Sequence, residues 1–382
     1  MKRKTGYLEV VSTASEPFKA FTPYPLPPEP PLNFRNDLLK ALENTNRALG
    51  RLDGLPTFFP DISLFLYFYV RKEALLSSQI EGTQSSFSDL LLYEMKVSPG
   101  VPIKDVEEVS SYVAALNYGI EGLKEFPICS RLLRNIHGVL LSKGRGQRRA
   151  PGIYRTSQVW IGGSAPGDAV FIPPPSHKVE DCIASLENFI NSDSVPTLIK
   201  AALAHVQFET IHPFLDGNGR LGRLLITLIL FAEKALSQPL LYLSLFFKKN
   251  RSAYYDWLQR VRSEGDWEGW LRFFLSGVHE TAEQAVLTAK KINDLFELDR
   301  EMIRNRGEGL ANSMLAIHDF LMKNPMTNAG NIASGLANIS RPTVYKALRV
   351  LEAIGIIEET TGRVRGKIFL YKSYFDLLKE GV

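Results

Sequence analysis

The chain has 382 residues, enough for two or three domains that each bury a core. Its 45% apolar content is typical of soluble globular proteins, and a net charge of +4 neither requires nor excludes a nucleic acid partner. Two cysteines, Cys129 and Cys182, lack CxxC spacing, which indicates burial in a reducing compartment rather than a disulfide or metal site. The start of the chain lacks an apolar signal segment, and the apolar run 224–232 is too short to cross a bilayer. We therefore expect a cytoplasmic protein without a membrane segment.

The first 33 residues predict little regular structure beyond one short strand at 7–11. The proline-rich run 23–31 favours polyproline II, either as a docking ligand for another protein or as an arm laid across its own domain. A helix over 38–52 ends at Gly54.

Residues 61–81 predict a second helix, which Asp61 caps and Gly82 ends. Ser77 and Glu81 are four residues apart on one face, so the hydroxyl can orient the carboxylate. A glutamate in the last turn faces the negative end of the helix dipole, an unfavourable position without a cationic partner. From spacing alone, a solvated surface glutamate explains it.

Two amphipathic helices are expected at 106–123 and 130–141. The basic stretch 143–149 is typical of a solvated loop, with phosphate contact as the alternative. Residues 151–161 alternate as a strand does, 162–168 turn, and 169–172 return before three prolines, which predicts a β-hairpin.

The densest chemistry lies between a helix at 197–211 and a strongly apolar helix at 221–232. The connecting sequence runs His-Pro-Phe-Leu-Asp-Gly-Asn-Gly-Arg-Leu-Gly-Arg from His212 to Arg223. Glycines at a helix start allow backbone N–H groups to approach a phosphate, and two arginines three residues apart can bind phosphate oxygens. Asp216 offers an oxygen ligand for Mg²⁺, and His212 can accept a proton near neutral pH. This combination indicates phosphoryl or nucleotidyl transfer to a protic nucleophile.

Further helices are expected near 250–258, at 267–276 and at 280–304. Asn250, Tyr254 and Tyr255 could receive a nucleotide base, with core packing as the equal alternative for the tyrosines. The last of these helices is long and charged enough to link domains or to dimerise.

From about residue 310 the pattern resembles a winged helix-turn-helix domain, with helices at 313–322, 331–337 and 340–354 and a two-stranded wing over 356–371. Arg341, Thr343, Tyr345 and Lys346 fall on the recognition helix, and Arg363 and Arg365 on the wing. DNA binding through residues 310–382 and protein binding are equally compatible with this pattern.

The stretch from His212 to Arg223 resembles the signature of the Fic family, HxFx(D/E)GNGRxxR, and matches it at every specified position. The resemblance implies transfer of AMP from ATP, with Mg²⁺, to a hydroxyl side chain of a target protein or of the enzyme itself. Glycine at position 219, where the kinase-like Doc branch has lysine, favours nucleotidyl transfer.

By this resemblance His212 deprotonates the target hydroxyl, Asp216 holds Mg²⁺, and Arg223 binds the γ-phosphate. The implied anion hole consists of Gly217, Asn218, Gly219 and Arg220. Asn250 is implied at the base, and Tyr254 or Tyr255 less directly. In the family a flap near the histidine, here Val159, Trp160 and Ile161, binds the target segment by strand addition.

Ser77-Ser-Gln-Ile-Glu81-Gly82 matches the family's inhibitory motif, (S/T)xxxE(G/N). The implied mechanism is that Glu81 pairs with Arg223 in place of the γ-phosphate. The glutamate could also position water for removal of AMP from a modified target.

The expected fold is therefore mainly α: a Fic-type helical core with a small β-hairpin flap, followed by the winged helix-turn-helix domain. We place the arm and the region carrying the inhibitory helix at 1–110, the catalytic core at 111–285, a linker helix at 286–309 and the winged domain at 310–382. The alternative to an enzyme is a DNA-binding regulator that senses nucleotide. His212 favours the enzyme, since a sensor needs Arg220 and Arg223 but no base. A homodimer and donors such as UTP or GTP stay open.

Overall fold

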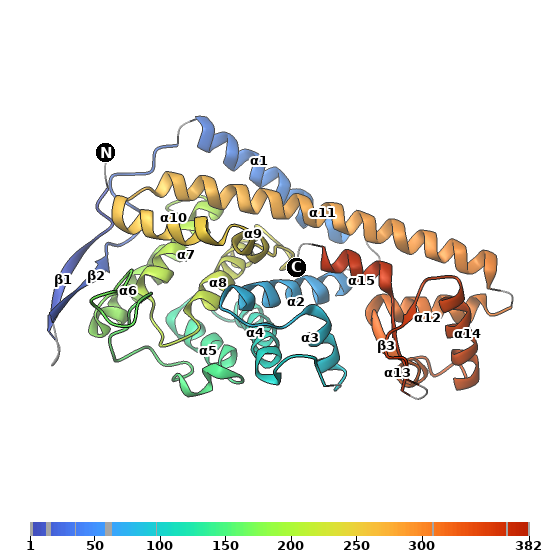
Figure 1. Cartoon of the computed structure of the whole chain (residues 1–382). Helices are drawn as coiled ribbons and strands as arrows, with labels where there is room; N and C mark the ends of the chain where they lie inside the picture. Colours follow the sequence, from blue (N-terminus) through green and yellow to red (C-terminus); the bar gives the residue numbers. More distant parts are fainter. Residues whose placement is uncertain are drawn as a thin grey trace. The chain divides into compact units, whose positions relative to one another are not determined.

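The computed structural model describes residues 3–12, 17–34, 36–57, 63–96, 98–307, 309–363 and 366–380. These residues divide into two compact units. The first combines 1–53, 69–86 and 101–283, and the second combines 54–68, 87–100 and 284–382. As expected, the protein is mainly α-helical (Figure 1).

The first unit contains two strands and most of the helices. They are β1 (Gly6–Ser12), β2 (Pro17–Pro23), α1 (Asn36–Asp53), the larger part of α2 (Ser63–Ile80), α4 (Ile103–Gly122), α5 (Ser130–Leu140), α6 (Val179–Ile190), α7 (Thr197–Ile211), α8 (Asn218–Ala232), α9 (Ser244–Lys249), α10 (Arg251–Glu264) and the start of α11 (Trp267–Arg306), with short 3₁₀ turns at Arg145–Arg148 and Ser176–Lys178.

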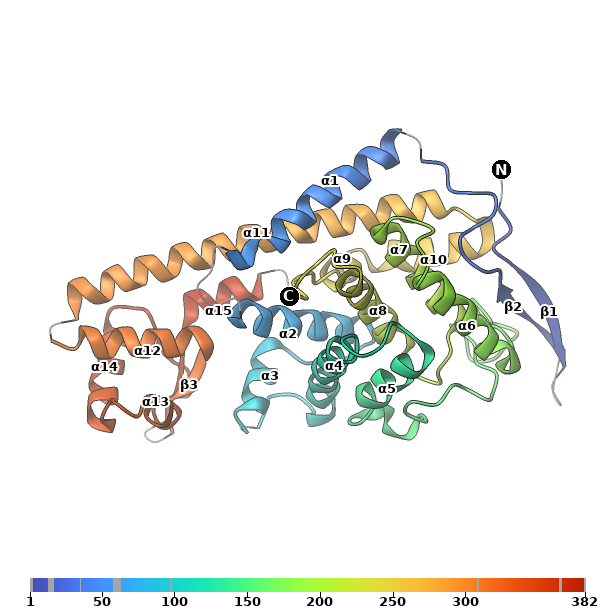
Figure 2. The ribbon, with the colours of Figure 1, turned by 180° about the vertical axis from the view of Figure 1, so that it is seen from behind.

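The centre of this unit is the pair α7 and α8, which lie side by side (Figures 1 and 2). Both are buried on every side over most of their length, α7 from Leu198 to Ile211 and α8 from Leu221 to Leu230. Neighbours α4, α5, α6 and α10 pack against the pair. A helix without a polar face is stable only when other helices cover it, which explains the apolar sequence of 221–232.

The second unit is built on a three-stranded antiparallel sheet with strand order β3-β5-β4. Its elements are a 3₁₀ turn at Leu55–Thr57, the start of α2, α3 (Phe87–Glu94), the rest of α11, α12 (Ala311–Lys323), β3 (Met326–Asn328), α13 (Ala329–Gly335), α14 (Arg341–Ala353), β4 (Glu358–Glu359), β5 (Ile368–Leu370) and α15 (Lys372–Lys379). A two-stranded wing was expected; β3 adds a third strand, because Thr327 and its neighbours pair with β5. Assignment to the winged-helix class stays a prediction, and Arg365 lies outside the described residues.

Three other expectations about local structure are wrong. The N-terminal segment is not one strand but a paired hairpin, in which Gly6 faces Pro23 and Ser12 faces Pro17. The hairpin at 151–172 reduces to a single bridge between Ile161 and Phe171. Pro173, which would face Val159 in this register, has no N–H to donate, so the ladder cannot extend on that side.

The helices expected at 267–276 and 280–304 form one helix, α11, which continues through Gly277. A Cβ at Gly277 would lie 2.5 Å from the Phe246 ring, so glycine is there for close packing and not as a breaker. Predicted domain boundaries at 285 and 309 stay predictions. The start of the second helix at Asp61 lies outside the described residues, which show α2 from Ser63.

Among the described residues, no helix combines the length and apolar character needed to cross a lipid bilayer.

Gly277→Ala should lower the free energy of unfolding by about 1–3 kcal/mol, because the added methyl group displaces a packed aromatic ring. The matched control is Gly50→Ala in α1, where no atom lies within 4 Å of the new Cβ. That change should raise stability by about 0.5–1 kcal/mol through helix propensity. Urea unfolding of both variants measures the difference, and equal effects would contradict the packing explanation.

Candidate active site

The loop between α7 and α8 is held in one shape by backbone conformation and by one amide side chain. His212 ends α7 in the left-handed region, with φ 48° and ψ 62°, and Gly217 precedes α8 with φ 78°. The Asn218 side chain closes the loop: its Oδ1 accepts from the Phe214 N–H at 2.9 Å and its Nδ2 donates to the Phe214 carbonyl at 2.8 Å. A contact from Asn218 to phosphate would therefore use its backbone N–H.

The start of α8 is built to receive an anion. Its first N–H groups have no intrahelical acceptor, and the positive end of the helix dipole lies there. Arg220 is buried and donates to Glu108 at 3.3 Å, with Asp216 at 3.5 Å. Glu108 also accepts from Arg145, which fixes the position of the carboxylate and therefore of Arg220.

Asp216 is the exposed carboxylate of the loop, with 41% of its side chain accessible. Its Oδ1 accepts from the Gly217 N–H at 2.6 Å. No group of three or more His, Cys, Asp or Glu side chains in the described part of the chain could hold a metal by itself. A single carboxylate beside the free N–H groups of a helix start fits Mg²⁺ if phosphates bind there, since Mg²⁺ usually takes one or two carboxylates together with substrate phosphates.

Arg223 lies one turn further along α8 and is 2% exposed. Its Nε donates to the Ser77 hydroxyl at 2.9 Å, and its Nη2 donates to the Ser77 carbonyl at 3.0 Å and to Glu81 Oε1 at 2.6 Å. The Ser77 hydroxyl therefore orients the guanidinium and not, as expected, the carboxylate. Glu81 lies directly over the start of α8, since a Cβ at Gly219 would be 2.2 Å from its Oε1.

Electrostatics favour the ionised form of this pair. Burial acts to raise the pKa of Glu81, but the Arg223 guanidinium outweighs burial and holds the pKa below its ordinary value. Gly82 ends the helix with φ +96°, a conformation that glycine adopts without strain. Helix α2 is anchored at Glu73, which is buried and accepts from the Ser244 backbone N–H and from Tyr112.

His212 is uncharged at physiological pH. Burial, followed by the charges of Arg262 and Arg155, lowers its pKa to about 3, while Glu81 acts in the opposite direction. Its Nδ1 has no hydrogen-bond partner among the described residues. That nitrogen is buried, so a proton from outside the core would have to reach the other ring nitrogen, Nε2.

The structure separates the two tyrosines proposed for the base. Tyr254 is 1% exposed, and its hydroxyl bonds to His205 Nε2 at 2.8 Å, so it belongs to the core. Tyr255 is 42% exposed on the surface of α10. Asn250 lies at the junction of α9 and α10, where its amide donates to the Phe246 carbonyl at 3.0 Å.

The flap residues leave one backbone edge available. Trp160 is 40% exposed, and within the described ranges no backbone hydrogen bond uses its N–H or carbonyl group. Ile161 pairs with Phe171, and the Val159 carbonyl accepts from Gln158. On the opposite side, Phe21 of β2 donates to the Ile172 carbonyl at 2.9 Å, so the N-terminal hairpin supports the returning segment.

His137 is a site residue that sequence reasoning missed. Its Nδ1 accepts from the Gly152 N–H at 2.8 Å, which leaves Nε2 to donate to the Asp216 carbonyl at 2.9 Å. The ring stacks on Phe214 at 3.7 Å. Burial lowers its pKa to about 4, so it stays neutral and orients the loop. A lone histidine in an amphipathic helix gives no sequence signal for this contact.

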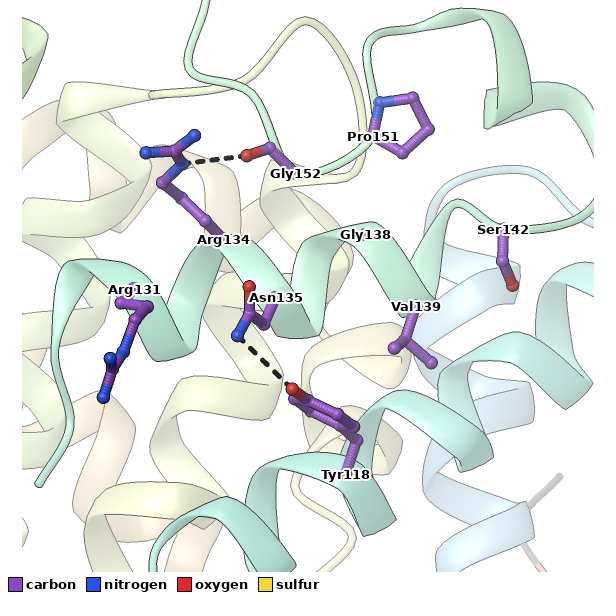
Figure 3. Close-up of a pocket in the computed structure, with 9 residues that line it drawn as sticks. All are labelled: Tyr118, Arg131, Arg134, Asn135, Gly138, Val139, Ser142, Pro151 and Gly152. Atoms are coloured by element: carbon purple, nitrogen blue, oxygen red, sulfur yellow. Dashed lines mark hydrogen bonds between the residues drawn. The ribbon is translucent and has the colours of Figure 1, made fainter. Parts of the chain in front are cut away.

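One well-formed pocket lies outside this site. It has a volume of about 770 Å³ and lies on the exposed side of α5, where Arg131, Arg134 and Asn135 line it (Figure 3). Arg134 donates to the Gly152 carbonyl, and Asn135 to the Tyr118 hydroxyl. None of the residues implied by the motif lines it.

Two models of known families match the chain: Fic/DOC family N-terminal over residues 39–121 and Fic/DOC family over residues 127–230. This part of the chain belongs to the Fic/DOC family. The second model contains the α7–α8 loop, and the first contains Ser77 and Glu81.

Similar proteins include Protein adenylyltransferase Fic of Drosophila erecta, 34% identical over 66% of this chain and 46% of that protein. The same-named protein of Aedes aegypti is 27% identical over 74% of this chain and 52% of its own. A probable protein adenylyltransferase of Aquifex aeolicus is 27% identical over 49% of this chain and 48% of that protein. The chain spans about half the length of these relatives.

Solved structures show the same fold at low identity. A Fic family protein from Desulfovibrio desulfuricans G20 aligns with 90% of this chain and 98% of its own, with a TM-score of 0.60 and 21% identity. Fic-1 of C. elegans aligns with 68% of this chain and 73% of its own, with a TM-score of 0.51 and 23% identity.

His205 provides a test of the buried network around the Fic loop. Burial lowers its pKa to about 3, against an ordinary value of 6.5. Below about pH 6.5 the histidine is therefore protonated in the unfolded chain but stays neutral in the folded chain. The stability advantage of wild type over His205→Gln should therefore shrink by on the order of 1–2 kcal/mol between pH 7 and pH 5.

Glu209→Gln is the matched control with the opposite sign. Burial raises the Glu209 pKa to about 7, so the folded state holds a proton that the unfolded chain releases. Wild type should gain stability over this variant as pH falls from 7 to 5. Urea unfolding at the two pH values decides, and the same sign for both variants would refute the assignment.

Proposed function

We propose that the chain transfers AMP from ATP to a hydroxyl side chain of a protein, either a separate target or itself, and that Glu81 holds the enzyme in an inhibited state. The observation that carries the proposal is the contact of Glu81 with Arg223 over the start of α8, which begins two residues beyond Asp216. The charge of Glu81 also acts on the pKa of the neutral His212. Relatives named protein adenylyltransferase support the reaction class, and the match to this chain covers about half of their length.

In the proposed reaction His212 takes the proton of the target hydroxyl as its oxygen forms a bond to the α-phosphorus. The bond between the α-phosphorus and the bridging oxygen breaks, and pyrophosphate leaves with the electron pair. The low pKa of His212 keeps the base unprotonated at neutral pH, although it also makes the ring a weak base. The reaction therefore relies on phosphate positioning and charge stabilisation more than on proton affinity.

The phosphates would contact the free N–H groups at the start of α8, with Arg220 and Arg223 as cationic partners. Asp216 would hold Mg²⁺, which when bound screens the negative charge of the phosphates. Glu108 restrains Arg220 through an ion pair, so this guanidinium is already in place before nucleotide arrives.

Inhibition follows from competition for one guanidinium. Arg223 Nη2 is within hydrogen-bond distance of Glu81, and the space above Gly219 is filled by that carboxylate. A γ-phosphate oxygen would accept from the same Arg223 Nη2, and the phosphate and the Glu81 carboxylate cannot both bind there. Removal of Glu81 should therefore admit ATP in a productive position.

Glu81→Gly should increase transfer of AMP by roughly tenfold or more, because productive ATP binding no longer has to displace a paired carboxylate. Intact-mass analysis after incubation with ATP and Mg²⁺ detects the added AMP, and Glu81→Gly/His212→Ala should lose it. If self-modification is absent, candidate target proteins provide the acceptor.

The matched control is Ser78→Ala in the same turn of α2, because the Ser78 hydroxyl has no hydrogen-bond partner among the described residues and the Glu81–Arg223 pair stays intact. It should stay at the wild-type level. Equal rates for wild type and Glu81→Gly would refute inhibition, and loss of AMP from a modified target in wild type would instead support AMP removal, with Glu81 positioning water. ATP binding without transfer to any acceptor would favour a nucleotide-sensing regulator.

A second candidate function is DNA binding by α14. Its exposed face carries Tyr345 and three cations, Arg341, Lys346 and Arg349. None of the three cations has an ion pair with a carboxylate in the described part of the chain. Ser340 caps the helix by accepting from the Thr343 N–H, which places the basic residues at an exposed helix start. Such a face suits the major groove of duplex DNA.

Replacing Arg341, Lys346 and Arg349 by alanine should weaken binding of a random-sequence duplex and reduce the slope of log K against log salt by about 2–3, since each lost phosphate contact removes about 0.9. Fluorescence anisotropy across a salt series measures both. Glu352→Ala on the same helix is the control for helix damage. Absence of binding by wild type at low salt would rule out this function.

A further inference from the structure

Arg155 is a buried arginine whose side chain donates hydrogen bonds only to backbone carbonyls in the described part of the chain. It is 2% exposed, and no carboxylate forms an ion pair with it in the described part of the chain. Burial lowers its pKa to about 10, which leaves it charged at neutral pH. A buried charge without a counter-ion is costly, so the carbonyl groups around it must be well placed.

The four carbonyl groups belong to two different segments. On one side the guanidinium donates to His212 at 2.8 Å through Nε and to Ile211 at 3.3 Å through Nη2. On the other side it donates to the carbonyls of Ser157 at 3.3 Å and Pro174 at 2.6 Å. These two residues lie just before and just after the stretch that contains the flap and its returning segment. The carbonyls of Ile211 and His212 lie at the C-terminus of α7, where no N–H group of the helix can donate to them. A cation is also favourable at this end of the helix dipole.

We propose that Arg155 is a positioning residue that fixes the base of the flap relative to His212, so that a bound target segment presents its hydroxyl to the imidazole. The proposal rests on the proposed transfer of AMP. The flap has one β-bridge of its own, so its strands do not set this position. Arg155 joins both ends of the flap to the residue that would act as base, and its backbone N–H donates to Pro213 as well.

Lysine cannot replace this arrangement. A guanidinium presents five donors in a rigid planar fork, whereas an ammonium group is a point charge on a flexible chain. Arg155→Lys therefore keeps the charge and loses the bridge, while Arg155→Met loses both. The two variants separate the geometric role from the electrostatic effect on His212, whose surroundings also include Arg262 and Glu81.

The first experiment measures steady-state transfer in the Glu81→Gly background. Arg155→Lys should lower kcat roughly 10–100-fold, because a small misplacement of reacting groups has a large effect on rate. The KM for ATP should stay within about twofold, since Arg220 and Arg223 are untouched. Arg134→Lys is the matched control, because Arg134 also donates to a backbone carbonyl of this segment but is exposed. It should leave both constants unchanged.

Two readouts do not need activity. Hydrogen exchange in Arg155→Lys should quicken at 157–161, 170–172 and 211–212 and stay unchanged at 221–230 in α8. Titration of the His212 imidazole by NMR should show a higher pKa in Arg155→Met and no comparable rise in Arg155→Lys. These results would show that Arg155 fixes the flap relative to His212 even if AMP transfer itself were disproved, so failure of the proposed function and failure of the positioning role can be told apart.

Faster exchange in α8 as well as in the flap would mean that Arg155 only stabilises the core, and would overturn the proposal. Unchanged exchange at the flap in Arg155→Lys would overturn it too. A fall in kcat that the Arg134→Lys control shares would equally count against it.

Discussion

The arrangement of the site depends on one interaction: the buried Arg223 guanidinium is paired with the Glu81 carboxylate. Only 2% of the residue is exposed, at the start of a helix that is apolar on every other side. Ser77 offers two neutral acceptors, but the compensating charge comes from Glu81. A buried ion pair that loses one member leaves an uncompensated charge, which is strongly unfavourable. Whichever anion occupies Arg223 therefore determines the state of the site.

The fold supports this interaction by fixing both partners before they meet. Helices α7 and α8 form a buried pair, so Arg223 cannot move into solvent without breaking the core. Helix α2 is fixed by the buried Glu73, which binds Ser244 and Tyr112 and so sets the position of the helix that ends at Glu81. Under the proposed inhibition, the element that must move is the last turn before Gly82, because Glu81 is the more exposed member of the pair. A short, partly exposed turn is the easiest part to displace when another anion competes for the guanidinium.

The sequence predicted the helices best where the pattern was continuous and ended in a clear signal. Residues 197–211 form α7 with the expected bounds, and the loop lies where the glycines placed it. Side chains that contact backbone carbonyls, such as Arg155 and His137, were missed because neither periodicity nor spacing encodes such contacts. Tyr254 and Tyr255 are adjacent, and only the packing of α10 decides which one is buried. The flap pairs through one antiparallel bridge and not along two strands, because alternation indicates a strand but does not set how far the pairing extends.

Under the proposed function, the charges around His212 would let the Glu81 carboxylate and a phosphate exchange without disabling the proposed base. Burial and the cations Arg262 and Arg155 lower the pKa of the imidazole, while Glu81 raises it. Departure of Glu81 alone would lower the pKa further and weaken the base. A nucleotide phosphate that replaces Glu81 at Arg223 restores negative charge at the same place. The proton affinity of His212 is therefore maintained only when the carboxylate is exchanged for another anion, which couples competence of the base to occupation of the phosphate site.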